Sequence, residues 1–357
     1  MRIYECVCNT PLFFDNSQCL SCSREVGWCP NCYALRALEA LGNGVYCCTH
    51  PDCAAELVKC QNYQQYDVCN RMVARSEYER GFHFCDCCRC NSIIPDLSIP
   101  GAQARWSALE RAKRRLFYTL DLLGLPHQSA SDPCPELPLS FSFMGDAVPE
   151  GQGRWRWAGQ DVVYTGHAQG NITINVREAD DAERERMRVN MGEEHRTLIG
   201  HFRHEIGHYY WELLVKNRDE EACMSVFGDH RSPTYAQAMD TYYANGPAPD
   251  WRTHHVSAYA SMHPWEDFAE TFALYLDIVS VMDTAEGCGL CKPMKDNTLE
   301  ATLGHWARLG IMLNELNRDM GLLDFAPEII QSKVIEKLRY IDRLITQGVS
   351  VSRGTGQ

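Results

Sequence analysis

Apolar positions after residue 100 recur at helical spacing in several separate segments. In residues 105–124, Trp106, Leu109, Leu116, Leu120 and Leu123 fall on or near one face, and Gly124 with Pro126 ends the predicted helix. Its basic cluster at 111–115 is expected to be a solvated face. Further helices are predicted over 200–214, 232–246, 263–278, 297–320 and 327–347.

Three strand-like runs precede the predicted helix at 200–214. They are LSFSF (139–143), RWRWA with VVY (154–158 and 162–164) and NITINV (171–176). The last run is expected to be an edge strand, against which an extended peptide pairs through main-chain hydrogen bonds. The charged stretch 177–196 is expected to be a mobile surface loop, with a possible role as a lid, or a short solvated helix.

Cysteine content divides the chain sharply. Fifteen of the 19 cysteines lie before residue 91, and the stretch PDLSIPG (95–101) marks the join. We therefore expect a Cys-rich zinc-ribbon region over 1–98, a second domain over 99–349 and a disordered tail over 350–357. No charged segment followed by an apolar run opens the chain, and no apolar run approaches about 18 residues, so a soluble, cytoplasmic protein is expected.

Clustered cysteines in a reducing compartment are expected to bind metal rather than to form disulfides. CxxC pairs allow two thiolates to share one tetrahedral zinc ion, and the spacings favour two to three structural sites. The first site would join Cys6 and Cys8, whose CxC spacing departs from the usual one, to Cys19 and Cys22. The second would use Cys29, Cys32, Cys53 and either Cys47 or Cys48, with His50 as a spare candidate. The third would use Cys60, Cys69, Cys85 and Cys88, unless Cys87 and Cys90 form its CxxC pair. Cys288 and Cys291 form a CxxC without a partner pair and are expected to be packed or surface thiols.

The charge balance disfavours nucleic acid and anionic membranes as partners. The net charge is −13, and residues 1–100 hold 8 Lys and Arg against 11 Asp and Glu, without a basic stripe. Each ribbon is too small for a sizeable core, so bound zinc would supply folding free energy on the order of 10 kcal/mol per site. Protein recognition or substrate presentation is the expected role of the ribbons.

His204, Glu205 and His208 form an HExxH motif on the predicted helix 200–214. Two histidines four residues apart project from one helix face toward a single metal ion, and Glu205 reaches a metal-bound water as general base. A catalytic zinc takes three protein ligands and keeps a fourth position for water. Segment 263–278 is the best source of the third ligand, because Glu266 and Glu270 stand four residues apart there. One can bind the metal while the other supports a ligand histidine.

These residues resemble the gluzincins, whose third zinc ligand is a glutamate on the helix after the HExxH helix. The resemblance implies that Glu266 is the ligand and that Glu270 supports a zinc-bound histidine. Pro264 can occupy the first helical turn, which places Glu266 near the helix start and favours the same assignment. Residues 257–272 are also similar to a stretch of the catalytic domain of anthrax lethal factor, which implies that Tyr259 donates its phenol to the developing oxyanion. His263 is a weaker candidate for that donor.

A fuller resemblance, to bacterial zinc-binding metallopeptidases with an N-terminal zinc-ribbon region, covers nearly the whole chain. The segments that carry it are 69–73, 85–98, 105–126, 198–211, 227–230 and 257–276. It implies an α+β fold with a zincin-like domain, one catalytic zinc ion, and a peptide or protein substrate. The alternatives are a zinc-dependent interaction module without catalysis and, third, a nucleic-acid-binding ribbon protein.

Overall fold

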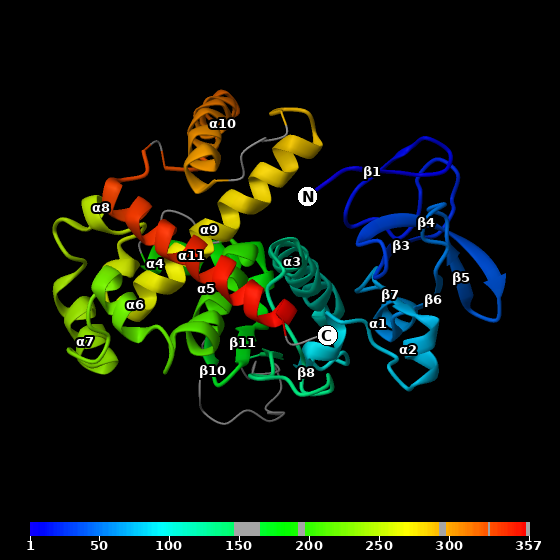
Figure 1. Cartoon of the computed structure of the whole chain (residues 1–357), viewed down its shortest axis with the longest axis horizontal. Coiled ribbons are helices and arrows are strands. Elements are labelled where there is room, and N and C mark those ends of the chain that lie inside the picture. Colours follow the sequence, from blue (N-terminus) through cyan, green and yellow to red (C-terminus); the bar gives the residue numbers. More distant parts are fainter. Residues whose placement is uncertain (146–164, 192–196, 293–297, 328, 355–357) are drawn as a thin grey trace. The chain divides into compact units, whose positions relative to one another are not determined.

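The computed structural model describes residues 1–145, 165–191, 197–292, 298–327 and 329–354, which divide into two units. The first unit comprises Met1–Tyr118 with His127–Ile199, and the second comprises Thr119–Pro126 with Gly200–Gln357. Figure 1 labels their helices and strands where there is room. The predicted strand pieces at 154–158 and 162–164 lie outside the described residues. Within the described ranges, the helices include none with the length and apolar content needed to cross a bilayer.

The first unit begins with short antiparallel strands, and most of its cysteines lie in the segments between them. β1 (Tyr4–Glu5) pairs with β2 (Pro11–Leu12). A five-stranded antiparallel meander then runs through β3 (Val26–Cys29), β4 (Ala34–Gly42), β5 (Val45–Cys48), β6 (Glu56–Lys59) and β7 (Met72–Ala74). The Trp28 N–H donates to the Asn70 carbonyl at 2.8 Å, which brings β3 next to the start of β7 and curls the sheet toward closure. Helices α1 (Gln61–Tyr66) and α2 (Arg75–Glu79) and the 3-10 turn η1 (Cys88–Cys90) complete this region.

A second sheet in the same unit has the order β10-β11-β9-β8. Its strands are β8 (Asn91–Ile93), β9 (Ser140–Met144), β10 (Gly166–Ala168) and β11 (Asn171–Asn175). β11 is parallel to β9 and antiparallel to β10, so it has a neighbour on each side. The prediction that 171–176 is an edge strand is therefore wrong. The neighbour that it did not include is β10, a strand of three residues, which is too short to show an alternating pattern in the sequence. β8 belongs to this sheet although it lies within the region 1–98.

The charged stretch after β11 forms a short 3-10 turn, η2 (Val176–Ala179), and the helix α4 (Asp181–Met191). Described side chains at the start of α4 are exposed or half-buried, which agrees with the predicted short solvated helix. The remainder of that stretch, 192–196, lies outside the described residues.

Helix α3 (Ala102–Leu123) confirms the helix predicted over 105–124, but its basic cluster is not a solvated face. Lys113 is fully buried and pairs with buried Glu110 at 3.0 Å, and Glu110 also accepts from Trp106 at 3.0 Å. Arg114 is buried as well and donates to the Val68 carbonyl. Charged side chains can be buried in a protein when they are paired and hydrogen-bonded. The spacing of apolar residues along a helix does not reveal such pairing.

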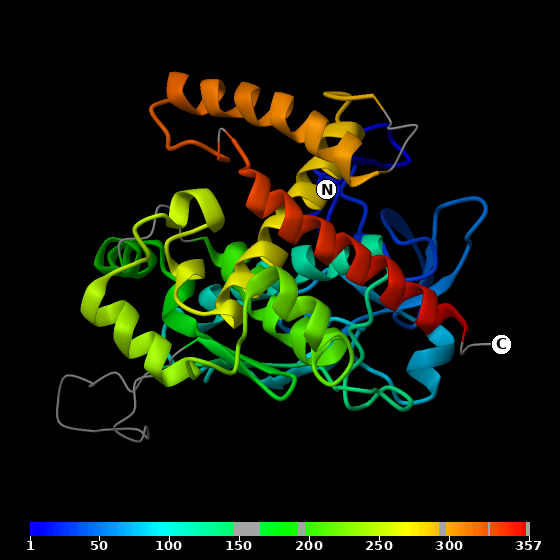
Figure 2. The ribbon, with the colours of Figure 1, turned by 60° about the vertical axis from the view of Figure 1, so that its left-hand side comes forward.

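The second unit is helical and is built around α9 (Pro264–Gly287). The other elements are α5 (Leu198–Tyr210), the π-helical turn η3 (Trp211–Val215), α6 (Glu220–Phe227), α7 (Tyr235–Asn245), α8 (Trp251–His254), η4 (Tyr259–Ser261), α10 (Leu299–Asp319) and α11 (Ser332–Gly354). Both α10 and α11 pack against α9, and Figure 2 shows α11 as one continuous helix. The sequence analysis predicted a disordered tail over 350–357; α11 continues through Gly354, and 355–357 lie outside the described residues. A helix that is already formed extends at little cost over residues of ordinary propensity.

A buried ion pair joins α9 to α11. The Asp267 carboxylate lies 2.6 Å from the Lys337 ammonium, and the exposed fractions of their side chains are 1% and 7%. His255 Nδ1 lies 3.2 Å from the same carboxylate, and Lys337 also donates to the His254 carbonyl at 2.5 Å. The pair thus ties α11 and the end of α8 to the first turns of α9.

Candidate metal centre

The HExxH helix and α9 approach each other closely at Gly207. A Cβ atom at this position would lie 2.9 Å from the Ala269 Cα and 3.1 Å from the Ala269 carbonyl oxygen, so only glycine fits without a shift of one helix. One turn further, the Tyr210 and Phe272 rings stack with centroids 5.2 Å apart. Glycine within a helix costs roughly 0.5–1 kcal/mol relative to alanine. Here it allows the histidines of α5 to reach the glutamates of α9.

Donor atoms of the three predicted zinc ligands converge at this crossing. Glu266 Oε2 lies 3.0 Å from His204 Nε2 and 3.4 Å from His208 Nε2. The two Nε2 atoms lie 3.1 Å apart. His208 and Glu266 are buried and His204 is half-buried. The structure therefore brings together one donor atom from each residue that the sequence analysis proposed as a ligand.

The spacing and chemistry of these atoms fit a zinc ion. Bonds of about 2.0–2.1 Å at tetrahedral angles place neighbouring ligand atoms about 3.3 Å apart, close to the three distances found. Glu266 Oε2 is buried and has no hydrogen-bond partner among the described residues. A buried carboxylate oxygen without a partner is costly unless a cation compensates it. Two imidazoles and one carboxylate are also a donor set that catalytic zinc sites use.

Glu270 and Ser257 orient His204 from behind. The Nδ1 of His204 lies 2.5 Å from Glu270 Oε1, and the Ser257 hydroxyl donates to Glu270 Oε2 at 2.7 Å. A carboxylate only accepts, so Nδ1 carries a proton, and Nε2, which faces Glu266 and His208, is the nitrogen that can bind a metal. This is the arrangement by which a carboxylate supports a zinc-bound histidine. The contacts match the role that the resemblance implied for Glu270.

The charged groups of the site shift each other's pKa values. Burial lowers the pKa of His208. Burial would also lower the pKa of His204, but the carboxylates of Glu266 and Glu270 beside its ring outweigh burial and raise that pKa well above its usual range. Burial opposes ionisation of Glu266, yet the two histidines hold its pKa well below the usual value. The carboxylate is thus ionised, as a metal ligand must be.

Tyr259, the predicted oxyanion donor, lies on η4 beside the centre. Its ring centroid is 6.2 Å from that of His204. Burial and the nearby Glu266 raise the pKa of Tyr259 far above its usual value, so the phenol keeps its proton. His263, the weaker candidate, instead caps α9. Its Nδ1 accepts from the Trp265 N–H at 3.1 Å and its Nε2 donates to the His230 carbonyl at 3.1 Å.

Two aromatic residues at the centre were not found from the sequence. The Trp265 ring stacks on the His208 ring with centroids 3.7 Å apart. The Tyr235 phenol donates to Glu266 Oε1 at 2.8 Å. Trp265 stands next to Glu266 and could have been suspected on that ground. Tyr235 is 31 residues away in the sequence, on a helix that was predicted without a functional role.

The structure also gathers the cysteines of the ribbon region into three groups of four. They are Cys6, Cys8, Cys19 and Cys22; Cys29, Cys32, Cys48 and Cys53; and Cys60, Cys69, Cys85 and Cys88, with the sulfur atoms of each group within 4.8 Å of one another. The closest sulfur pairs are 3.6 to 3.9 Å apart. Zinc–sulfur bonds of about 2.3 Å at tetrahedral angles require about 3.8 Å. The four sulfurs in each group therefore have the spacing of a zinc site.

The local backbone supports these groups. In the first two, the residue after the second cysteine of each turn is left-handed, as at Asn9, Ser23, Tyr33 and Ala54. In the third, backbone N–H groups point at sulfur, for example Arg71 N–H to Cys69 Sγ at 3.3 Å and Cys85 N–H to Cys60 Sγ at 3.4 Å. Such hydrogen bonds stabilise a thiolate more than a neutral thiol.

The structure also shows where the alternative cysteines lie. Cys48 belongs to the second group, whereas the Cys47 thiol lies against the Cys48 carbonyl at 3.5 Å. Cys85 and Cys88 belong to the third group, and the Cys90 thiol faces the Asp86 carbonyl at 3.4 Å. At Cys288 and Cys291 the left-handed residue is Gly289, which lies between the two cysteines, so this turn differs from the ribbon turns.

Four zinc ions per chain are expected, three in the ribbons and one at the HExxH centre, because each donor set has its full complement. Native mass spectrometry and elemental analysis of protein purified without chelators would count them. The His204→Ala variant should hold one ion fewer, which assigns the fourth to α5. A count of two or fewer in the unmodified protein would contradict the three-ribbon assignment.

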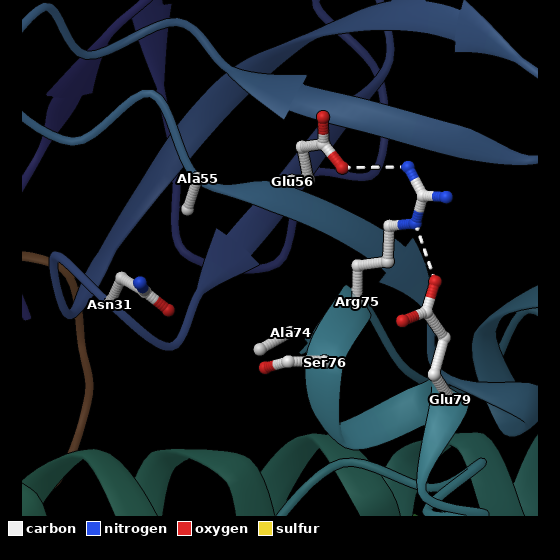
Figure 3. Close-up of a pocket in the computed structure, with 7 residues that line it drawn as sticks. All are labelled: Asn31, Ala55, Glu56, Ala74, Arg75, Ser76 and Glu79. Atoms are coloured by element: carbon white, nitrogen blue, oxygen red, sulfur yellow. Dashed lines mark hydrogen bonds and ion pairs between the residues drawn. The ribbon is translucent and has the colours of Figure 1, made fainter.

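A cavity of about 430 Å³ opens in the ribbon region. Figure 3 shows Arg75 in its wall with its guanidinium bonded to Glu56 and Glu79, at 2.7 and 2.8 Å. The two carboxylates already neutralise this cation. The lining contains none of the predicted site residues, and we assign it no role.

Comparison with known proteins places this chain in a family. The model of a family described as "Putative zinc-binding metallo-peptidase" matches residues 102–344, and a zinc-ribbon domain model matches residues 3–99. Uncharacterized proteins of Mycobacterium bovis and Mycobacterium tuberculosis are 34% identical over 361 residues, which cover 97% of this chain and 96% of each relative. No solved structure matches the chain, so the similarity to lethal factor stays a prediction.

These matches confirm the predicted recognition and the α+β fold, with a Cys-rich zinc-ribbon region ahead of a metallopeptidase region. The relatives carry no described activity that could be transferred to this chain. With a model match over more than half of its length, the chain belongs to the zinc-binding metallo-peptidase family.

Proposed function

We propose that this protein is a gluzincin-type zinc peptidase that hydrolyses peptide bonds in peptide or protein substrates. The observation that carries the proposal is the convergence of His204 Nε2, His208 Nε2 and Glu266 Oε2 on one point, from two helices that cross at Gly207. A closed structural zinc site usually has four protein ligands. Three donors, with Glu205 between the two histidines, favour an open and catalytic site.

Each residue has a task in this proposal. Zinc, when bound, lowers the pKa of a coordinated water toward about 7 and polarises a peptide carbonyl. Glu205 accepts the proton of the attacking water and delivers it to the leaving amine. Tyr259 donates its phenolic hydrogen to the oxyanion that develops on the former carbonyl oxygen. Glu270 keeps the His204 ring in the required tautomer and orientation.

The ribbons are proposed to recognise the substrate or a protein partner. Their acidic balance, 11 acidic against 8 basic residues up to position 100, does not provide the positive surface that nucleic acid requires. A zinc-dependent interaction module without catalysis is the alternative function, and its centre would not depend on Glu205.

Hydrolysis is best tested with a library of diverse peptides. The zinc-loaded protein is incubated with the library and the products are sequenced by mass spectrometry, with the Glu205→Gln variant as the blank. Cleavage by the unmodified protein alone would support the peptidase. Intact peptides in both samples, with the fourth zinc ion present, would favour the interaction module.

Exchanging each glutamate of α9 separates the ligand from its support. Glu266→Ala removes a charged metal bond and should strip zinc from the centre. Glu270→Ala removes the orienting hydrogen bond to His204 and should weaken zinc affinity or activity roughly 10- to 100-fold. Competition with a chelator of known affinity measures both variants. A larger loss in Glu270→Ala than in Glu266→Ala would reverse the two roles.

A further inference from the structure

The two oxygen atoms of the Glu266 carboxylate face different partners. Oε2 faces the Nε2 atoms of His204 and His208 at 3.0 and 3.4 Å. Oε1 accepts a hydrogen bond from the Tyr235 phenol at 2.8 Å. Because Glu266 is buried, few other donors can reach Oε1. The phenol therefore determines which oxygen remains available to a cation.

Tyr235 is held firmly in place for this contact. Thr234 and Gln237 form a reciprocal capping box that starts α7 at Tyr235. The Tyr235 ring packs edge-on against Trp265 and His263, with centroids 5.6 and 5.4 Å apart. Both of those residues belong to the start of α9, where His263 is the helix cap and Trp265 precedes Glu266. The ring and the hydroxyl of Tyr235 are thus both fixed to the turn that carries the carboxylate.

The same helix also contacts the predicted oxyanion donor. Tyr242 lies seven residues after Tyr235, on the same face of α7, and packs edge-on against Tyr259 with centroids 6.0 Å apart. Helix α7 therefore contacts both the Glu266 carboxylate, through Tyr235, and the Tyr259 ring, through Tyr242.

We propose that Tyr235 is a positioning residue that keeps Glu266 a one-oxygen metal ligand. The inference rests on the proposed zinc centre. A carboxylate whose second oxygen is free can bind an ion through both oxygens and occupy the position that water or substrate needs. With Oε1 engaged by the phenol, that position stays open.

Cobalt substitution tests this role without relying on catalysis. The HExxH centre is emptied with a chelator of moderate strength and refilled with cobalt(II), whose visible absorption is much stronger in four-coordinate than in five-coordinate sites. Cobalt that entered a ribbon would reveal itself by intense sulfur-to-metal charge-transfer absorption. Tyr235→Phe should lose several-fold in visible absorption, because Glu266 then binds through both oxygens. Its zinc affinity should also change by roughly 10- to 100-fold.

Tyr243→Phe is the matched control, because Tyr243 is on the same helix and its exposed fraction is 65%. It should match the unmodified protein in both measurements. Equal spectra and equal affinities for Tyr235→Phe and the control would overturn the proposal. Phenylalanine keeps the ring contacts, so the metal-free variants should melt together; a much lower melting temperature for Tyr235→Phe alone would also overturn it, because the phenol would then hold the fold. An unmodified protein that takes up no cobalt outside the ribbons would instead refute the zinc centre itself.

Discussion

Glu205→Gln is expected to abolish peptide hydrolysis while the protein keeps its full complement of zinc. Glu205 is buried on α5 between the two histidines, and it is absent from the group of donor atoms that converge on one point. Glutamine has nearly the same shape but accepts no proton at neutral pH. General-base catalysis is typically worth about 10²- to 10⁴-fold, and here the same group also protonates the leaving amine. Turnover is measured by product formation, and zinc by elemental analysis of the same sample.

The control for this variant is Glu212→Gln, two residues after α5 ends, where the carboxylate pairs with Lys216 at 3.5 Å. It makes the same chemical change outside the centre and should leave hydrolysis intact. Loss of one zinc ion from Glu205→Gln would show that Glu205 is a ligand and that the roles are wrongly assigned. Unchanged hydrolysis with zinc retained would show that another group is the base.

Cys48→Ser is expected to release one zinc ion and unfold the ribbon around β5, whereas Cys47→Ser should do neither. The two cysteines are neighbours, but only the Cys48 sulfur joins Cys29, Cys32 and Cys53. A structural zinc ion contributes on the order of 10 kcal/mol to the folding of so small a region. The zinc count by native mass spectrometry and the resistance of residues 1–98 to limited proteolysis measure the two effects.

Retention of all zinc ions in Cys48→Ser, with a loss in Cys47→Ser, would show that Cys47 and not Cys48 is the zinc ligand. Equal losses in both would indicate that the strand tolerates either sulfur as ligand. Protection from protease can also be compared with and without excess zinc. The Cys47→Ser protein should stay protected even when no zinc is added.

Motifs that lie within one helix could be predicted well from the sequence. His204, Glu205 and His208 have fixed relative directions once the segment is helical, and the same holds for Glu266 and Glu270. The cysteine pairs are equally local, because a tight turn determines where its two sulfurs point. In such cases spacing along the chain translates directly into geometry, so the proposed donor atoms meet in the structure.

Features that depend on contacts between distant segments could not be predicted. The Tyr235 bond to Glu266 joins residues on two helices, and no pattern within α7 distinguishes Tyr235 from Tyr242 or Tyr243. The burial of Lys113 could not be predicted, because a charged residue in a helical pattern is normally assigned to the solvent-exposed face. In the structure, the Glu110 carboxylate compensates the Lys113 charge inside the protein. The short strand β10 is defined by its partner β11 rather than by its own three residues.

The ion pair between Asp267 and Lys337 determines how much of the chain a working fragment must include. Asp267 follows Glu266 directly, and its buried carboxylate is neutralised from α11, near the end of the sequence. A fragment that stops before Ser332 would leave that charge without its lysine partner in the turn that presents Glu266. An uncompensated buried charge costs about 3–5 kcal/mol, enough to distort or unfold a marginal domain. The smallest piece of this protein able to hold metal at the HExxH helix therefore extends past Lys337.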